Sequence, residues 1–242
     1  MLTRLPKLLP NKITNFFRGT EIDRIYDDLK LRLESFSEIK VETAGGNISL
    51  VVPEYAREWY SEGHEPILAS DLTDNLTEDS VFYDIGSQFG FFIELALREG
   101  LETNQIHGFE AEYFHYRILD QQYSERAHLI HDWVGKGNDG SLSIDDYTHS
   151  NDPPDVIKID VEGAEADILD GMKETLSDKK PLLYIEIHPN KLDGFGRSSN
   201  EIIELLEQME YELDTSNHRN KESVWVPVDR NDENGTYLLR GK

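Results

Sequence analysis

Residues 81–90 read Val-Phe-Tyr-Asp-Ile-Gly-Ser-Gln-Phe-Gly, an apolar run that leads through an acid into two glycines. The spacing predicts a strand over 81–86 and a helix over 91–100. Glycines between a strand and a helix let the backbone turn sharply and approach a ligand closely. Open parallel sheets bind their ligands at this position. We therefore expect a ligand loop here, made of Asp84, Gly86, Ser87, Gln88, Phe89 and Gly90.

The alternation of strand and helix continues downstream of this loop. Further strands are predicted at 105–110, 128–134, 155–163 and 181–189, and further helices at 112–124, 164–176 and 199–209. The C-terminal segments are rich in strand formers and are expected to add an antiparallel edge. Such an order predicts an α/β, Rossmann-like fold with a mostly parallel sheet and helices on both faces.

The segment before the loop has a different pattern. Residues 21–37 have helical spacing, and alternation on both sides of Gly45-Gly46-Asn47 indicates a β-hairpin. Residues 55–77 are expected to be mainly helical. We therefore divide the chain into residues 1–77, a helical segment plus a hairpin packed on the core, and residues 78–242, the ligand-binding domain.

The chain is strongly acidic, with 24 Lys and Arg against 48 Asp and Glu, a formal net charge of −24. The acids are spread over most segments, as in halophilic proteins that stay hydrated in concentrated salt. A concentrated acidic patch for a cationic partner is the alternative. Nucleic acid is not an expected partner, because binding it requires basic surface.

The absence of cysteine excludes disulfides and thiolate chemistry and suits a cytoplasmic protein. No apolar run is long enough to cross a membrane. Residues 1–20 are basic and apolar, however, and contain no acid. They predict either a segment packed on the domain or a peripheral contact with an anionic membrane.

The glycine spacing differs from the G-x-G-x-x-G that wraps a dinucleotide pyrophosphate. An acid at the end of the strand repels phosphate and suits an ammonium group, which favours S-adenosylmethionine over a nicotinamide cofactor. Glu110 ends the next strand, where an acid can accept from both ribose hydroxyls. After the third strand, Asp132 and Trp133 are placed to meet the adenine ring.

The fourth and fifth predicted strands end in charged residues, which are costly to bury without a purpose. Lys158, Asp160 and Glu162 are expected on one face, with Glu186 and His188 on the neighbouring strand. We expect catalytic residues among Lys158, Asp160, Glu162 and His188, with Asp160 or His188 as the base for a hydroxyl proton. Asp160, Glu162, Glu186 and His188 could instead hold a divalent metal, although they form no compact ligand motif. An ion-pair cluster that includes Lys158 is the purely structural alternative.

Together these segments resemble the FkbM family of methyltransferases. The resemblance is carried by FYDIGSQFGFF, GFEAE, SLSIDDY, PPDVIKIDVEGAEADILDG and EIHP. It implies a class I methyltransferase that uses S-adenosylmethionine, with the cofactor at Asp84, Gly86, Gly90 and Glu110 and the reacting group beside Asp160 and Glu162. The sequence departs from the family at Ser87-Gln88, where Ala-Asn is usual, and at Ala111, where proline is usual. The resemblance further implies O-methylation of a hydroxyl on a sugar, glycan or glycolipid.

Two other functions are compatible with the same architecture. One is a nicotinamide-dependent enzyme, for which the glycine loop has the wrong spacing. The other is a methyltransferase-like binding domain without turnover, against which the acids and the histidine at the strand ends argue. The sequence does not give the oligomeric state.

Overall fold

The computed structural model describes residues 21–60, 63–216, 224–228 and 236–242. Residues 1–20, on which the expected membrane contact rests, lie outside this part of the chain. No helix within the described ranges is long and apolar enough to cross a membrane.

The centre of the molecule is a mixed sheet, which has eight strands within the described residues, in the order β5-β4-β3-β6-β7-β10-β8-β9. The first five in that order are parallel, and β10, β8 and β9 are antiparallel. The strands are β3 (Phe82–Ile85), β4 (Ile106–Phe109), β5 (His128–Ile130), β6 (Val156–Ile159), β7 (Leu182–Ile187), β8 (Leu213–Ser216), β9 (Val226–Pro227) and β10 (Tyr237–Gly241). The predicted Rossmann-like sheet with an antiparallel C-terminal edge is confirmed.

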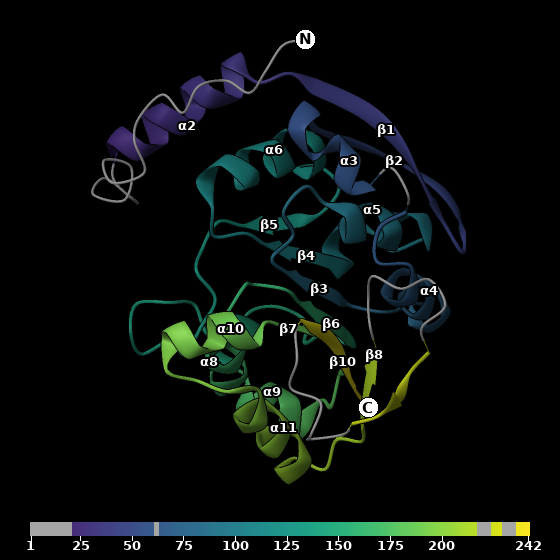
Figure 1. Cartoon of the computed structure of the whole chain (residues 1–242), viewed down its shortest axis with the longest axis vertical. Helices are drawn as coiled ribbons and strands as arrows, with labels where there is room; N and C mark the ends of the chain where they lie inside the picture. Colours follow the sequence, from purple (N-terminus) through teal and green to yellow (C-terminus); the bar gives the residue numbers. More distant parts are fainter. Residues whose placement is uncertain (1–20, 61–62, 217–223, 229–235) are drawn as a thin grey trace.

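Helices cover both faces of this sheet (Figure 1). One face packs against α4 (Pro66–Asn75), α5 (Phe91–Arg98) and α6 (Tyr113–Tyr123), and the other against α7 (Ile144–Thr148), α8 (Glu165–Asp170), α9 (Lys173–Asp178) and α11 (Ser199–Gln208). Alternation along the strands supplies both cores, since Phe82 belongs to the first cluster and Tyr83 to the second. The short elements that remain are α3 (Arg57–Tyr60), α10 (Pro189–Leu192), η1 (Glu54–Ala56), η2 (Thr103–Gln105) and η3 (Asp193–Phe195).

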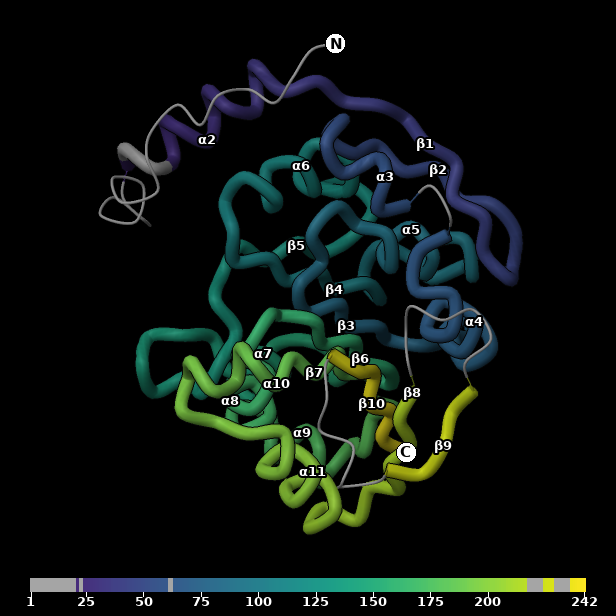
Figure 2. Tube along the Cα trace, in the orientation of Figure 1, coloured from purple at the N-terminus to yellow at the C-terminus, as the bar shows by residue number. Residues whose placement is uncertain are grey.

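The hairpin of β1 (Phe36–Thr43) and β2 (Gly46–Pro53) turns at Ala44-Gly45, as the glycines indicated. Its buried residues Val41, Ile48, Leu50 and Val52 belong to the same hydrophobic cluster as α4, α5 and α6. The hairpin therefore shares a core with one face of the sheet. The chain then runs through α3 and α4 into β3, a path that can be followed in Figure 2.

Four predicted elements differ from the structure by several residues, one of them the strand expected at 155–163, which ends at Ile159. The first helix, α2 (Glu21–Leu33), ends four residues early, and β1 begins at Phe36. The strand expected at 128–134 ends at Ile130. The helix expected at 164–176 is broken after Asp170, because the backbone of Gly171 meets that of Gly135. A Cβ on Gly171 would lie 1.9 Å from the Gly135 carbonyl oxygen.

Candidate functional site

The glycine loop after β3 folds over the end of the sheet. Gly86 and Gly90 both have left-handed backbone conformations, with φ of +85° and +82°. A Cβ on Gly86 would lie 1.9 Å from the carbonyl oxygen of Asp160, and one on Gly90 would lie 2.5 Å from the ring of Tyr123. Both positions therefore require glycine for conformation and for space. The loop is held as close to the end of β6 as two backbones allow.

Asp84 is the acid before these glycines, and it is completely buried. Lys158 faces it from β6, with Nζ 3.3 Å from Oδ1, and also donates to the carbonyl oxygen of Gly86 at 3.0 Å. Burial raises the pKa of Asp84, although the charge of Lys158 opposes the shift. Burial alone would lower the pKa of Lys158, but the charges of Asp84 and Asp160 outweigh it and raise that pKa. The acid that was expected beside the ligand therefore faces the buried ammonium group of Lys158.

The other residues of the loop have separate roles. The Ser87 hydroxyl donates to the carbonyl oxygen of Asp84 at 2.8 Å and closes the turn. Gln88 has a left-handed φ of 49°, and its side-chain oxygen accepts from the Tyr60 hydroxyl at 3.3 Å. Phe89 is fully buried against His115, which makes its side chain part of the core. The backbone and the polar side chains of the loop are therefore the groups that a ligand could contact.

Glu110 lies at the end of β4 and is 8% exposed. Its two carboxylate oxygens accept from the backbone N–H groups of Gln88 at 2.9 Å and Glu112 at 2.8 Å. Burial raises the pKa of Glu110 to about 7, although these hydrogen bonds oppose the shift. The carboxylate is thus fixed beside the glycine loop, where it was expected.

Asp132 and Trp133, the expected adenine contacts, follow β5 on an exposed loop. Trp133 is 48% exposed, and the carboxylate of Asp132 accepts from the Trp133 backbone N–H at 2.8 Å. The neighbouring strand end carries Glu110, whose N–H donates to the carbonyl oxygen of Ile130 at 3.0 Å. Both residues lie outside the two hydrophobic clusters, and they follow the strand end that pairs with Glu110.

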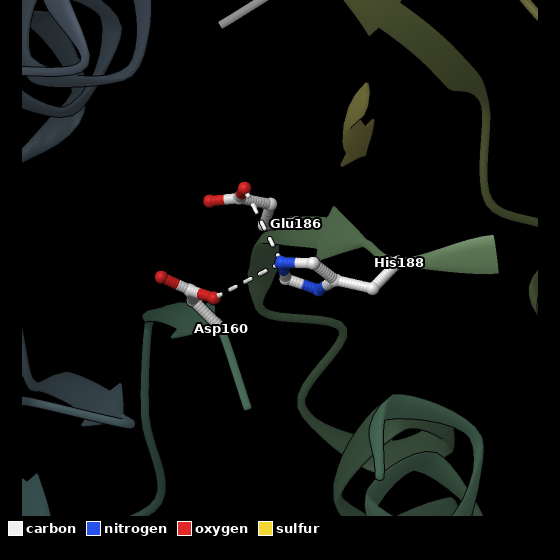
Figure 3. Close-up of side chains that lie close together, drawn as sticks. All are labelled: Asp160, Glu186 and His188. Atoms are coloured by element: carbon white, nitrogen blue, oxygen red, sulfur yellow. Dashed lines mark ion pairs between the residues drawn. The ribbon is translucent and has the colours of Figure 1, made fainter. Parts of the chain in front are cut away.

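Asp160, Glu186 and His188 converge at the ends of β6 and β7 (Figure 3). The Nε2 atom of His188 lies 3.4 Å from Oε1 of Glu186 and 3.9 Å from Oδ1 of Asp160. Burial raises the pKa of Asp160 to about 6, against the lowering effect of Lys158. One ligand atom from each of the three residues lies within 4.8 Å of the others. The strand ends thus place two carboxylates around one imidazole nitrogen.

Glu165 holds the other side of the imidazole. This carboxylate is completely buried at the start of α8, 2.8 Å from Nδ1 of His188, and it also accepts from the Gly163 N–H. Burial alone would lower the pKa of His188. The hydrogen bonds to Glu165 and Glu186 outweigh it and raise that pKa to about 10. Glu165 lies in the IKIDVEGAE segment, but the spacing alone did not single it out.

Glu162 is not part of this convergence. β6 ends at Ile159, and Glu162 has a left-handed φ of 57°, so the alternation expected from Lys158 to Glu162 stops at Asp160. The Glu162 side chain is 70% exposed and lies 2.5 Å from Nζ of Lys191. The structure therefore brings together Lys158, Asp160 and His188 of the predicted catalytic residues and places Glu162 outside.

Glu65 joins the site from the segment between α3 and α4, where sequence reasoning placed no functional residue. It precedes Pro66 with a left-handed φ of 41°, and its Oε2 is buried without a hydrogen-bond partner. Burial raises its pKa well above the ordinary range, and the charges of Asp160 and Glu186 add to the shift. An acid before a helix-starting proline usually indicates a solvated cap, so the sequence held no signal for this role.

The site fits a small cationic nucleoside. The glycine loop lies against the backbone of Asp160 and the ring of Tyr123, at two positions that exclude a Cβ. The two oxygens of Asp84 accept no hydrogen bond although they are buried. Asp160 adds negative charge nearby, and Glu110 presents a fixed carboxylate. Such an acidic strand edge suits an ammonium or sulfonium group and is unfavourable for a pyrophosphate.

Comparison with known proteins agrees with this geometry. The model of the FkbM methyltransferase domain matches residues 67–213. No similar protein of curated function is found. Among solved structures, fibrillarin of Aeropyrum pernix with natively bound S-adenosyl-L-methionine has a TM-score of 0.50 at 14% identity, over 85% of this chain and 83% of that one.

The methyltransferase FkbM of Methylobacillus flagellatus KT has a TM-score of 0.46 at 18% identity, over 69% of this chain. This chain covers only 44% of that protein's length. The fold is that of class I S-adenosylmethionine-dependent methyltransferases. The family match, which covers most of the chain, shows that this protein belongs to the FkbM methyltransferase domain family.

Proposed function

We propose that this chain transfers the methyl group of S-adenosylmethionine to a hydroxyl of a sugar, glycan or glycolipid. The observation that carries the proposal is the position of Asp160. Its carbonyl oxygen touches the glycine loop at Gly86, and its carboxylate lies between Lys158 and His188. A cofactor in the loop and an acceptor at the ends of β6 and β7 would therefore meet at this residue.

The cofactor would be held by residues already described. Glu110 is placed to accept from the ribose hydroxyls, and the carboxylates of Asp84 and Asp160 offset positive charge beside the loop. Asp132 and Trp133 remain the expected adenine contacts. When bound, S-adenosylmethionine supplies an electrophilic methyl group on a sulfonium centre.

The residues of this chain would position the acceptor and take its proton. Asp160, with a pKa of about 6, is ionised at neutral pH and is the better base. His188 keeps its proton there because its pKa is about 10, so it would orient the acceptor by donating from Nε2. Lys158 supports the ionised form of Asp160, with Nζ 3.7 Å from Oδ2. A base and a donor at one strand edge suit a hydroxyl acceptor. The net charge of −24 disfavours a nucleic-acid acceptor.

The proposal is tested in two steps with the full-length protein. Calorimetry with S-adenosylhomocysteine should show binding at one site. Radiolabelled S-adenosylmethionine should then transfer label to a panel of neutral glycans and glycolipids but not to RNA or DNA. Binding without transfer to any hydroxyl acceptor would favour a silent binding domain. Transfer to nucleic acid would contradict the assigned acceptor class.

A further inference from the structure

The cluster of Asp160, Glu186 and His188 has the dimensions of a cation site. Divalent transition ions bind imidazole nitrogen and carboxylate oxygen at about 2.0–2.2 Å. Two ligands at that distance from one ion, about 90–110° apart, are separated by roughly 3.0–3.5 Å. The Nε2 atom of His188 lies 3.4 Å from Glu186 and 3.9 Å from Asp160. Small side-chain adjustments would bring both oxygens and the nitrogen onto one ion.

The imidazole is held as metal-binding histidines usually are. A ligating histidine commonly gives its second ring nitrogen to a carboxylate, which fixes the ring and raises its basicity. Here Glu165 occupies Nδ1 at 2.8 Å, and Nε2 points toward Asp160 and Glu186 (Figure 3). Glu165 is itself fixed, because it accepts from the backbone N–H of Gly163 at 3.0 Å. Glu165, which orients the ring, is therefore itself held in place by the backbone.

The acidic groups around the cluster indicate separately that the site could accept a further positive charge. Glu65 is fully buried, its Oε2 accepts no hydrogen bond, and its pKa is raised in part by the charges of Asp160 and Glu186. The region holds the carboxyl groups of Asp84, Asp160, Glu165 and Glu186 against the positive charges of Lys158 and His188. Glu65 lies beside them with a raised pKa, and its Oε1 is 3.3 Å from Nε2 of His64. A sulfonium cofactor, which carries one net positive charge, would leave this group negative.

We propose that Asp160, Glu186 and His188 bind one divalent transition ion, such as Mn²⁺, with Glu165 as the carboxylate behind the histidine. One imidazole and two carboxylates suit such an ion, and three protein ligands leave coordination positions open for water or the acceptor. The ion would take the place of the Nε2 proton that His188 otherwise keeps at neutral pH. A hydroxyl bound there would be acidified beside Asp160. This role in catalysis rests on the proposed function, whereas binding of the ion does not.

Mn²⁺ titration of the EDTA-treated, full-length protein tests the site directly. Because the chain is so acidic, the titration belongs in high salt, where loosely held ions are screened. The paramagnetic resonance signal of free Mn²⁺ should decrease until one equivalent is bound. Pulsed measurements should show coupling of the bound ion to one imidazole nitrogen. That coupling is measured on the unsubstituted protein and does not depend on any variant folding.

Substitutions then assign the ligands. E186Q and H188Q should each weaken Mn²⁺ binding by about 100-fold, and E165Q by about 10-fold, as for groups that support a ligating histidine. E162Q is the matched control, because it removes an acid two residues from Asp160 that lies outside the cluster, and it should bind Mn²⁺ normally. A failure to saturate, a bound ion without nitrogen coupling, or binding unchanged in both E186Q and H188Q would each overturn the site.

The same samples separate this proposal from the proposed function. Calorimetry with S-adenosylhomocysteine measures the cofactor site without relying on a metal. A Mn²⁺ site with the expected ligands but no S-adenosylhomocysteine binding would remove the proposed function and keep the cation site. The converse result would remove the cation site and leave Asp160 as the base.

Discussion

Asp84 and Lys158 stand directly opposite each other on β3 and β6, with Nζ 3.3 Å from Oδ1 in an interior where neither side chain is more than 5% exposed. The two oxygens of Asp84 have no hydrogen-bond partner, so the positive charge of Lys158 is the main interaction that stabilises the buried carboxylate. Removing one member of a buried ion pair is far more costly than removing both. The pair therefore affects both the stability of the sheet and the charge beside the glycine loop.

We expect K158M to lower the free energy of unfolding by about 3–5 kcal/mol, because Asp84 would remain buried without its partner. The double variant D84N/K158M should recover much of that loss. Urea unfolding followed by circular dichroism measures both. A loss below about 1 kcal/mol for K158M, which is typical of exposed pairs, would contradict the buried pair.

The glycine loop gives a second prediction. G86A should weaken S-adenosylhomocysteine binding and lower stability, because the new Cβ would collide with the backbone of Asp160. G140A is the matched control, since Gly140 also has a left-handed φ, +92°, but has open space around it. The control should lose only the conformational cost, about 1–2 kcal/mol, and should bind normally. Equal losses in unfolding and binding would show that the contact with Asp160 does not matter.

Much of this site could be predicted because it follows from local pattern. Strand ends of a parallel sheet meet at one edge, so the positions of Asp84, Glu110, Asp160 and His188 followed from the alternation of strands and helices. The glycines predicted a close contact of the backbone, and the structure shows that Gly86 lies against the backbone of Asp160. The mostly parallel sheet and its antiparallel C-terminal edge also followed from the sequence.

The remaining features depend on contacts between distant segments. Glu65 is brought to the site by the packing of α4 on the sheet, which no local spacing reveals. Glu162 leaves the expected face because the strand ends before it. Gly171 breaks a helix because the backbone of Gly135 lies against it. On α2, Ile25 stays exposed, and the contacts with α6 include the ion pair of Asp28 and Arg117 at 3.0 Å.

Cofactor binding should depend on the protonation of Glu110. Burial raises its pKa to about 7, so the carboxylate that accepts from ribose hydroxyls is lost as the pH falls through that value. Affinity for S-adenosylhomocysteine should therefore be about tenfold tighter at pH 8 than at pH 6. E110Q should bind weakly at both pH values, and E112Q, which changes an exposed neighbour, should keep the dependence. Calorimetry at the two pH values measures this, and a flat profile in the unsubstituted protein would argue against ribose recognition by Glu110.

Asp160 should be required for transfer and not for binding of S-adenosylhomocysteine, which lacks the sulfonium charge. D160N keeps the backbone that meets Gly86 but cannot take a proton and offers only an uncharged oxygen to a cation, so methyl transfer should fall by about 10²–10⁴. S-adenosylhomocysteine binding, measured by calorimetry, should change little. D178N, which removes the same charge from the exposed end of α9, serves as the control. Full activity of D160N would exclude Asp160 as base and as metal ligand.

Salt should stabilise the fold. With a net charge of −24, the compact chain repels itself at low ionic strength more strongly than the expanded chain does. Salt at about 1 M reduces the screening length to roughly 3 Å and removes most of this repulsion. We therefore expect the melting temperature to rise from low to molar KCl, with sucrose of matched osmolality as a control for solvent exclusion. Several ion pairs, such as Lys180–Glu210, are exposed and contribute little, so screening them should not reverse the trend. A melting temperature that falls with KCl would mean that ion pairs dominate, and the interpretation of the acidic surface as an adaptation to salt would be wrong.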